Sequence, residues 1–315
     1  MMTLVYVLVF IGSALILGYT SNRLIKSLSK VARFLKWKEF VVAFFTMALA
    51  ASLSNFFVGI SSVIHKIPEL SFSDVIGGSI VDLTLAAGLA ALISNKGLKL
   101  KSRTVQGSAI FTLLIAILPI LLIQDGILSR FDGILLIIVF CLYIFWVFKK
   151  EDRFTKEYNS EKVKPANALK NFFIIILTVI ALLIASEGIV QSARYFAQAL
   201  GLSLPLVGLL IVGIGNALPE ISFAVQAAKK GDDWLVIGDL MGSIIIPATL
   251  VLGIVTILSP IEIPDFSPFA IARIFLVLAA LAFVIFTRTK QTIDKREGLY
   301  LIGLYILFLL AEIIL

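Results

Sequence analysis

Residues 213–222 read GIGNALPEIS, and they lie inside a longer apolar run, LPLVGLLIVGIGNALPEISFAVQAA, that covers 204–228. Proline removes a backbone hydrogen bond from a helix, glycine weakens a helix, and a carboxylate is costly in hydrocarbon. Pro219 and Glu220 therefore stand side by side in a place where neither is expected for structural reasons alone. The surroundings of this stretch indicate why they are there.

The composition is that of an integral membrane protein. The 315 residues are 60% hydrophobic and only 15% charged, whereas soluble proteins carry about 25% charged residues. A helix needs about 20 mostly apolar residues to cross a bilayer. Ten stretches meet this requirement: 3–20, 40–64, 72–94, 105–124, 131–148, 172–195, 204–228, 234–258, 267–287 and 298–315. The N-terminus lacks the basic flank and cleavage site of a signal peptide, so we expect its span to be retained.

The basic residues lie in alternate loops between these spans. Of the 27 Lys and Arg residues, 23 fall in five segments: 21–39, 96–103, 149–170, 229–233 and 288–297. Basic loops stay in the cytoplasm, so we expect both termini outside and the 149–170 loop inside, in the cell membrane of a prokaryote. This placement explains the net charge of +7 without nucleic acid. The expected partners are the lipid bilayer and metal cations, and no cofactor is expected.

The chain contains an internal repeat. A shift of 165 residues aligns its two halves without gaps around the most polar spans and gives eight identities in 25 positions. These residues fall on one another in order: Leu70, Asp74, Gly77, Ile80, Thr84, Leu85, Gly88 and Ser94 on Leu235, Asp239, Gly242, Ile245, Thr249, Leu250, Gly253 and Ser259. The same shift places Asn55 on Glu220.

Each half holds five spans, and an odd number gives the second half the opposite topology. We therefore predict an all-α membrane protein of ten transmembrane helices in two inverted five-helix repeats. The repeats are predicted at 1–148 and 172–315, joined by a cytoplasmic linker at 149–171. Inverted repeats are typical of secondary transporters, whose binding site lies near the membrane midplane at the repeat interface.

Glu220 is the sharpest candidate for that site. Pro219 frees a backbone carbonyl, and this carbonyl, the Glu220 carboxylate and Asn216 offer hard oxygen ligands of the kind that Ca²⁺ or Na⁺ takes. The only cysteine, Cys141, excludes a Cys-rich metal site. The structural alternative is a kinked helix with a protonated, hydrogen-bonded glutamate.

Three aspartates accompany Glu220 in the apolar spans. Asp82 lies in the middle of its span. We expect it to be a cation ligand or a proton carrier, and the structural alternative is a hydrogen bond to Thr84 or to a neighbouring helix. Asp74 and Asp239 are matched by the repeat and either bind ions or protons or cap their helices. Four polar residues complete the candidate set: Ser52, Asn55, Asn216 and Ser243.

Three further ionisable residues lie near the predicted outer ends of the spans. For Glu187 and Glu312 we expect a solvated or structural role, and for His65 a solvated loop position.

The two motif regions resemble those of the cation/calcium antiporters, and most of all the sodium/calcium exchangers. GIGNALPEISFAVQAA and GDLMGSIIIPATLVLG, at 213–228 and 238–253, are similar to the repeated motif of that family. MALAASLSNFFVGISS and SDVIGGSIVDLTLAAG, at 47–62 and 73–88, resemble a divergent copy. The topology resembles the family over the whole chain, and the specific motifs over about a third of it.

The resemblance implies a secondary antiporter rather than an enzyme, with Ca²⁺ bound by the acid that follows proline in each repeat. Here that acid is Glu220 in the second repeat, and Asn55 stands at the matching position of the first. Asp82 occupies a further ligand position of the family in the first repeat, and Pro247 stands at the equivalent position of the second repeat. Na⁺ and H⁺ both remain candidate counter-ions. Alternating access would come from spans 1 and 6 sliding over the other eight.

Three other functions are alternatives to Ca²⁺ antiport. One is transport of a different divalent cation, such as Mg²⁺ or Mn²⁺, and another is a relic that no longer transports. A remote one is an intramembrane aspartyl protease that uses Asp82 and Asp239.

Overall fold

The computed structural model describes residues 2–34, 52–94, 97–99, 103–150, 165–289 and 291–314, and most of these residues are helical. Within these ranges, seven helices are long and apolar enough to cross a membrane, and shorter apolar helices cover Leu53–Ile64 and Ala109–Asp125. In chain order the helices are α1 (Met2–Phe34), α3 (Leu53–Ile64), α4 (Glu69–Val81), α5 (Ala87–Ile93), α6 (Arg103–Leu122), α7 (Arg130–Lys150), α8 (Pro165–Leu200), α9 (Leu204–Val207), α10 (Gly213–Lys230), α11 (Asp233–Ile246), α12 (Leu252–Leu258), α13 (Ala270–Thr289) and α14 (Lys295–Ile314).

These helices coincide with the predicted spans. The most polar spans are continuous helices interrupted by π-helical turns: η1 (Asp82–Ala86), η4 (Gly208–Val212) and η5 (Pro247–Val251). Of the span predicted at 40–64, the part up to residue 51 lies outside the described residues. Because α8 begins at Pro165, it includes part of the segment predicted as a linker.

The π-helical turns reveal the repeat in the backbone itself. The turn η1 runs from Asp82 to Ala86 and η5 from Pro247 to Val251, so the shift of 165 residues relates the two turns end to end. Within each span, a threonine hydroxyl donates to the carbonyl four residues earlier, Thr84 to Ile80 and Thr249 to Ile245. Such turns often mark functional sites.

Two helix crossings connect the halves through glycine pairs. A Cβ atom on Gly88 of α5 would lie 2.7 Å from the Gly298 carbonyl oxygen of α14. A Cβ atom on Gly253 of α12 would lie 2.9 Å from the Gly133 carbonyl oxygen of α7. The shift of 165 residues relates Gly88 to Gly253 and Gly133 to Gly298, so the two crossings are equivalent. Each half thus packs its third span on the fifth span of the other, as two interlocked repeats require.

Short strands connect the same halves at their edges. β1 (Leu98–Lys99) pairs antiparallel with β4 (Thr292–Ile293), and β2 (Ile127–Leu128) with β3 (Ile261–Glu262). Two 3-10 turns, Ile123–Asp125 and Ser267–Phe269, complete the regular elements among the described residues.

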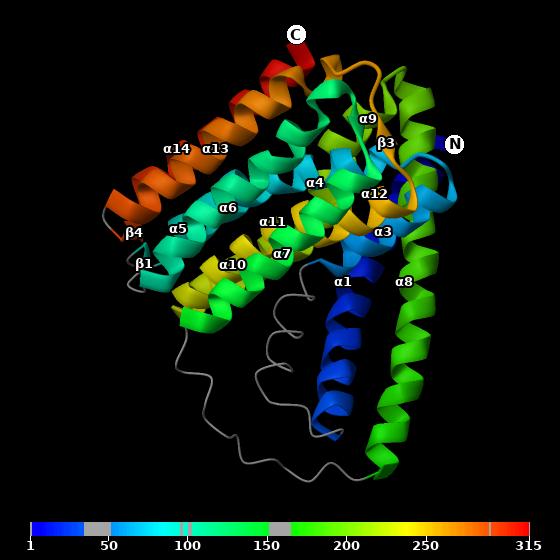
Figure 1. The fold of residues 1–315 in the computed structure, drawn as a ribbon, viewed down its shortest axis with the longest axis horizontal. Coiled ribbons are helices and arrows are strands. Elements are labelled where there is room, and N and C mark those ends of the chain that lie inside the picture. The colour runs from blue at the N-terminus through cyan, green and yellow to red at the C-terminus, as the bar shows by residue number, and fades with distance from the viewer. Residues whose placement is uncertain are drawn as a thin grey trace.

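Helices α1 and α8 form a pair at the side of the bundle (Figure 1). Their buried side chains belong to a second hydrophobic cluster, which also takes in residues of α3, α4 and α9. Neither α1 nor α8 contributes a described residue to the large core. The rings of Tyr6 and Tyr195 stack with centroids 4.1 Å apart, and the Tyr195 hydroxyl lies 2.8 Å from Thr3 Oγ1. The pair reaches α10 next to Glu220, because a Cβ on Gly18 would lie 2.7 Å from the Pro219 ring.

Candidate functional site

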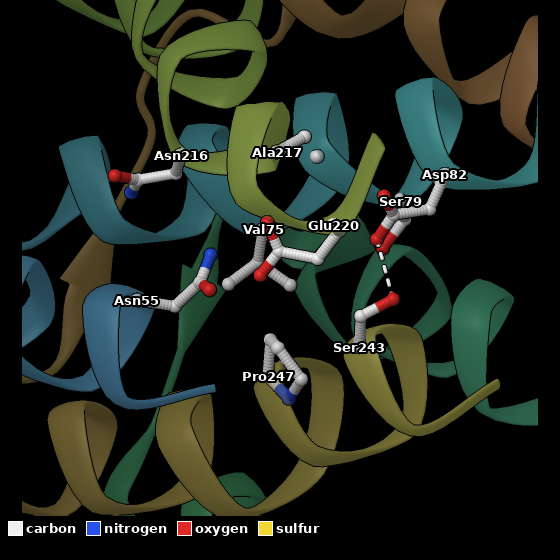
Figure 2. Close-up of a pocket in the computed structure, with 10 residues that line it drawn as sticks. Asn55, Val75, Ser79, Asp82, Asn216, Ala217, Glu220, Ser243 and Pro247 are labelled. Atoms are coloured by element: carbon white, nitrogen blue, oxygen red, sulfur yellow. Dashed lines mark hydrogen bonds between the residues drawn. The ribbon is translucent and has the colours of Figure 1, made fainter. Parts of the chain in front are cut away.

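A small buried cavity lies where α3, α4, α10 and α11 meet, at the π-helical turns (Figure 2). Its volume is about 10 Å³, which is close to the room that one water molecule needs. Ten residues line it: Asn55, Val75, Gly78, Ser79, Asp82, Asn216, Ala217, Glu220, Ser243 and Pro247. The cavity therefore has room for one small ion rather than for an organic substrate.

Asp82 enters the cavity from the junction of α4 and η1. It is almost fully buried, and its Oδ2 accepts a hydrogen bond of 2.6 Å from Ser243 Oγ of α11. Its Oδ1 is buried and has no partner among the described residues. The predicted hydrogen bond from Asp82 to a neighbouring helix is therefore made, but by only one of its two carboxylate oxygens. The bond to Thr84 is not made, because that hydroxyl turns back to its own helix.

Glu220 comes from α10, the helix that begins within the opening motif. Asn216 and Glu220 are four residues apart and therefore lie on one face of this helix. Glu220 is buried, and its Oε2 has no partner in the described part of the chain. Pro219 has no amide hydrogen, so the Gly215 carbonyl lacks its usual helical donor. Figure 2 shows the Glu220 side chain pointing toward Asn55.

The two asparagines share a partner outside the cavity. Asn55 Nδ2 donates to Asp74 Oδ2 at 3.2 Å, and Asn216 Nδ2 donates to the same oxygen at 2.8 Å. The Oδ1 atom of Asn216 is buried without a partner among the described residues. The cavity is therefore bordered by two amide groups whose nitrogens both donate hydrogen bonds to Asp74.

Five of the eight predicted ligands line the cavity and three do not. Asn55, Asp82, Asn216, Glu220 and Ser243 are brought together. Asp74 lies behind the asparagines, Ser52 is buried at the start of α3, and Asp239 is half-buried outside the lining.

The capping role considered for Asp74 and Asp239 is wrong. Helices α4 and α11 begin at Glu69 and Asp233, so both aspartates lie in the second turn, beyond the reach of a cap. The capping explanation assumed that each aspartate lies at the start of its helix, but α4 and α11 begin five and six residues before Asp74 and Asp239.

Sequence reasoning missed several lining residues. Val75, Gly78 and Ser79 lie on α4 one to two turns before Asp82, and Ala217 stands beside Asn216. Their spacing of three and four residues from named candidates was the signal that could have found Ser79 and Gly78.

The donors around the cavity are all oxygens. Two carboxylates and the side-chain oxygens of Asn and Ser are the ligands that hard cations such as Ca²⁺ prefer. None of the ten lining residues is a lysine, arginine, histidine or cysteine. Unpartnered buried oxygens are costly, and a bound cation is the natural partner for the free oxygens of Asp82 and Glu220. The residues present therefore fit one divalent cation as cargo.

A second polar network lies away from the cavity and corrects the prediction for His65. Instead of being solvated, His65 Nε2 lies 2.7 Å from Glu187 of α8. The same carboxylate accepts hydrogen bonds from Ser61 and Gln191, and Arg194 donates to the His65 carbonyl at 2.8 Å. Glu187 thus has the structural role that was expected for it, and it joins α8 to the end of α3.

The chain is similar to known membrane proteins over nearly its whole length. The chain is 25% identical to the inner membrane protein YrbG of Escherichia coli, with 98% of this chain and 96% of that protein covered. It is 23% identical to the sodium/calcium exchanger MaX1 of Methanosarcina acetivorans, over 92% and 93% of the two chains.

A solved structure of the sodium-calcium exchanger NCX_Mj, soaked with Na⁺ and Sr²⁺, has the same fold, with a TM-score of 0.67, 24% identity and coverage of 98% and 99%. The fold is accordingly all-α, with ten transmembrane helices in two inverted five-helix repeats. The sequence profile described as sodium/calcium exchanger protein matches residues 5–149 and 170–314. This chain belongs to the sodium/calcium exchanger family and is a cation/calcium antiporter.

Proposed function

We propose that the chain exchanges Ca²⁺ for Na⁺ across the membrane, holding the cation in the cavity between the two repeats. The observation that carries this proposal is the convergence of Asp82 and Glu220, one from each repeat, on a single oxygen-lined space with one unpartnered oxygen each. Two carboxylates balance the charge of one divalent ion. Na⁺ is chosen over H⁺ because MaX1 is named a sodium/calcium exchanger.

Glu220 and Asp82 would supply the charged ligands. Neutral oxygens would come from Asn55 and Ser243, and the Gly215 carbonyl left free by Pro219 is a further donor nearby. This set explains why proline and glutamate are adjacent in the opening stretch. The break frees a carbonyl one turn before the carboxylate that holds the cation.

Access to the cavity would alternate through movement of the α1–α8 pair. Support comes from the lack of any described α1 or α8 residue in the large core. It also comes from the contact with α10 beside Glu220, where Gly18 meets Pro219 and Phe10 meets Gly215. A displacement of α1 along α10 would therefore change the wall next to the bound ion.

The orientation that we propose follows the basic loops, with both termini outside and the 149–170 loop in the cytoplasm. The repeats would be 1–148 and 172–315 with a linker at 149–171, a division that agrees closely with the two matched ranges of the family profile. No enzymatic activity is proposed. Asp82 and Asp239 do not share the cavity, so they do not form the pair of carboxylates that an aspartyl protease needs.

The test is uptake of ⁴⁵Ca²⁺ by proteoliposomes under an imposed Na⁺ gradient and, separately, under an imposed pH gradient. The wild-type chain should take up Ca²⁺ with the Na⁺ gradient, and Glu220→Gln should abolish it. Glu312→Gln is the matched control, because it neutralises a half-buried acid of α14 outside the cavity and should leave uptake unchanged.

Uptake driven only by the pH gradient would replace Na⁺ with H⁺ in the proposal. Competition by Mg²⁺ or Mn²⁺ that exceeds that of unlabelled Ca²⁺ would replace the cargo. No uptake under either gradient, together with no stabilisation of the chain by Ca²⁺, would favour the relic.

A further inference from the structure

Asp74 is a fully buried carboxylate that does not line the cavity. It lies on α4, one turn before the lining residue Gly78. Its Oδ2 accepts the amide hydrogens of both Asn55 and Asn216, which reach it from α3 and α10. One carboxylate oxygen therefore joins three helices directly behind the candidate cation site.

The repeat supplies an internal comparison. The equivalent of Asp74 is Asp239, and the shift of 165 gives Asp239 the equivalents Glu220 and Ala51 where Asp74 has Asn55 and Asn216. Asp239 is half-buried, and its Oδ2 has no partner among the described residues. An aspartate that holds two amides is thus a feature of the first repeat and not a general need of the fold.

The geometry of a primary amide gives this contact a consequence. The nitrogen and oxygen of the group lie on opposite arms of one plane, so a carboxylate that holds Nδ2 also sets the direction of Oδ1. With both nitrogens on Asp74, the two asparagines have only their oxygens left to offer to a ligand. Figure 2 shows the Asn55 amide facing the Glu220 side chain, whereas the Asn216 oxygen, which is buried and has no partner among the described residues, points away from Glu220.

We infer that Asp74 is a positioning residue: it holds the amide nitrogens of Asn55 and Asn216, and it thereby fixes α3 against α10 with the Asn55 carbonyl oxygen free to face the transported cation. Asp74 does not itself contact the cation. The inference rests on the proposed function. It predicts that Asp74 acts through the two asparagines alone. Residues that orient metal ligands in this way typically change metal affinity by 10- to 100-fold when they are removed.

The experiment measures the KM for Ca²⁺ uptake by the full chain and the Ca²⁺-dependent rise in its unfolding temperature. Asp74→Ala should raise KM by about 10- to 100-fold with a smaller effect on maximal rate. Asp74→Asn should stay within about threefold of wild type, because its carbonyl oxygen can accept the same two amides. Ser73→Ala is the control on the same helix, since that hydroxyl only bonds the Glu69 carbonyl, and it should change neither quantity.

A cycle with the asparagines completes the test. In an Asn55→Ala, Asn216→Ala background, Asp74→Ala should have little further effect on KM. This background also removes the donors that Asp74→Ala would leave unpaired, so the variant keeps its fold there if the single variant does not.

Three results would overturn the inference: an unchanged KM in Asp74→Ala, an equal loss in Asp74→Asn and Asp74→Ala, or a full further loss in the background without the asparagines. A wild-type chain that neither transports nor is stabilised by Ca²⁺ would instead remove the proposed function, and the inference with it.

Discussion

Replacing Gly88 by alanine should destabilise the chain, because Gly88 stands at a crossing between the two repeats. Its new Cβ would lie 2.7 Å from both the Gly298 carbonyl oxygen and Ile302 Cγ1, closer than the 3.0 Å below which real Cβ contacts are essentially absent. Overpacking of this kind costs about 1–3 kcal/mol, and the better helix propensity of alanine returns up to about 1 kcal/mol. A net loss of about 1–2 kcal/mol is expected.

Because the two repeats are equivalent, replacing Gly253 by alanine should destabilise the chain as much as replacing Gly88. In Gly253→Ala the new Cβ would lie 2.7 Å from Ile137 Cγ1 and 2.9 Å from the Gly133 carbonyl oxygen, so the loss should match that of Gly88→Ala. Thermal unfolding of the detergent-purified chain is the assay, and each variant should melt several degrees lower. Gly303→Ala is the control, because nothing lies within 4 Å of its Cβ and its stability should be unchanged or higher.

The contact of the new Cβ with the Gly298 carbonyl can be tested separately from its contact with Ile302. Truncating Ile302 to alanine in the Gly88→Ala variant relieves the side-chain contact but leaves the Gly298 carbonyl in place, so stability should not return. Full recovery, or a Gly88→Ala variant as stable as the Gly303→Ala control, would refute the close crossing. A loss at Gly88 without an equal loss at Gly253 would refute the equivalence of the two crossings.

Two further substitutions test the polar contacts. Ser243→Ala removes the donor to buried Asp82 and should cost about 1–3 kcal/mol without Ca²⁺. Because Ser243 is also a proposed ligand, Ca²⁺ should raise the melting temperature of this variant less than that of wild type. Equal melting temperatures of variant and wild type without Ca²⁺ would contradict this. Glu187→Ala removes the acceptor of the Ser61 and His65 hydrogen bonds, but the Glu187 side chain is 45% exposed, so solvent screening limits the loss of stability to about 1 kcal/mol. The melting temperature should fall slightly. His65→Ala should cause the same fall, and the double variant should fall no further.

Much of the fold followed from the shift of 165 residues, because interlocked repeats repeat their backbone as well as their sequence. The same shift paired Asn55 with Glu220, and both side chains line one cavity. That these residues bind a cation stays a prediction. The contacts of Asp74 had no local signal, since its partners lie 19 and 142 positions away. The pair of His65 and Glu187 spans 122 positions and joins the two halves, so no periodicity within either half could indicate it.

The symmetry of the backbone is not shared by the charges. Asp82 and Glu220 come from α4–η1 and α10, helices that cross closely because Gly213 admits α4; a Cβ there would lie 2.8 Å from the Gly78 nitrogen. The positions related to these acids by the shift are Pro247 and Asn55, which are neutral and border the same cavity. A cation drawn to both carboxylates would therefore lie off the pseudo-two-fold axis, toward the α4–α10 crossing. Because alternating access moves one bundle around a fixed site, the outward and inward states would then present the same off-axis pair of carboxylates to the ion.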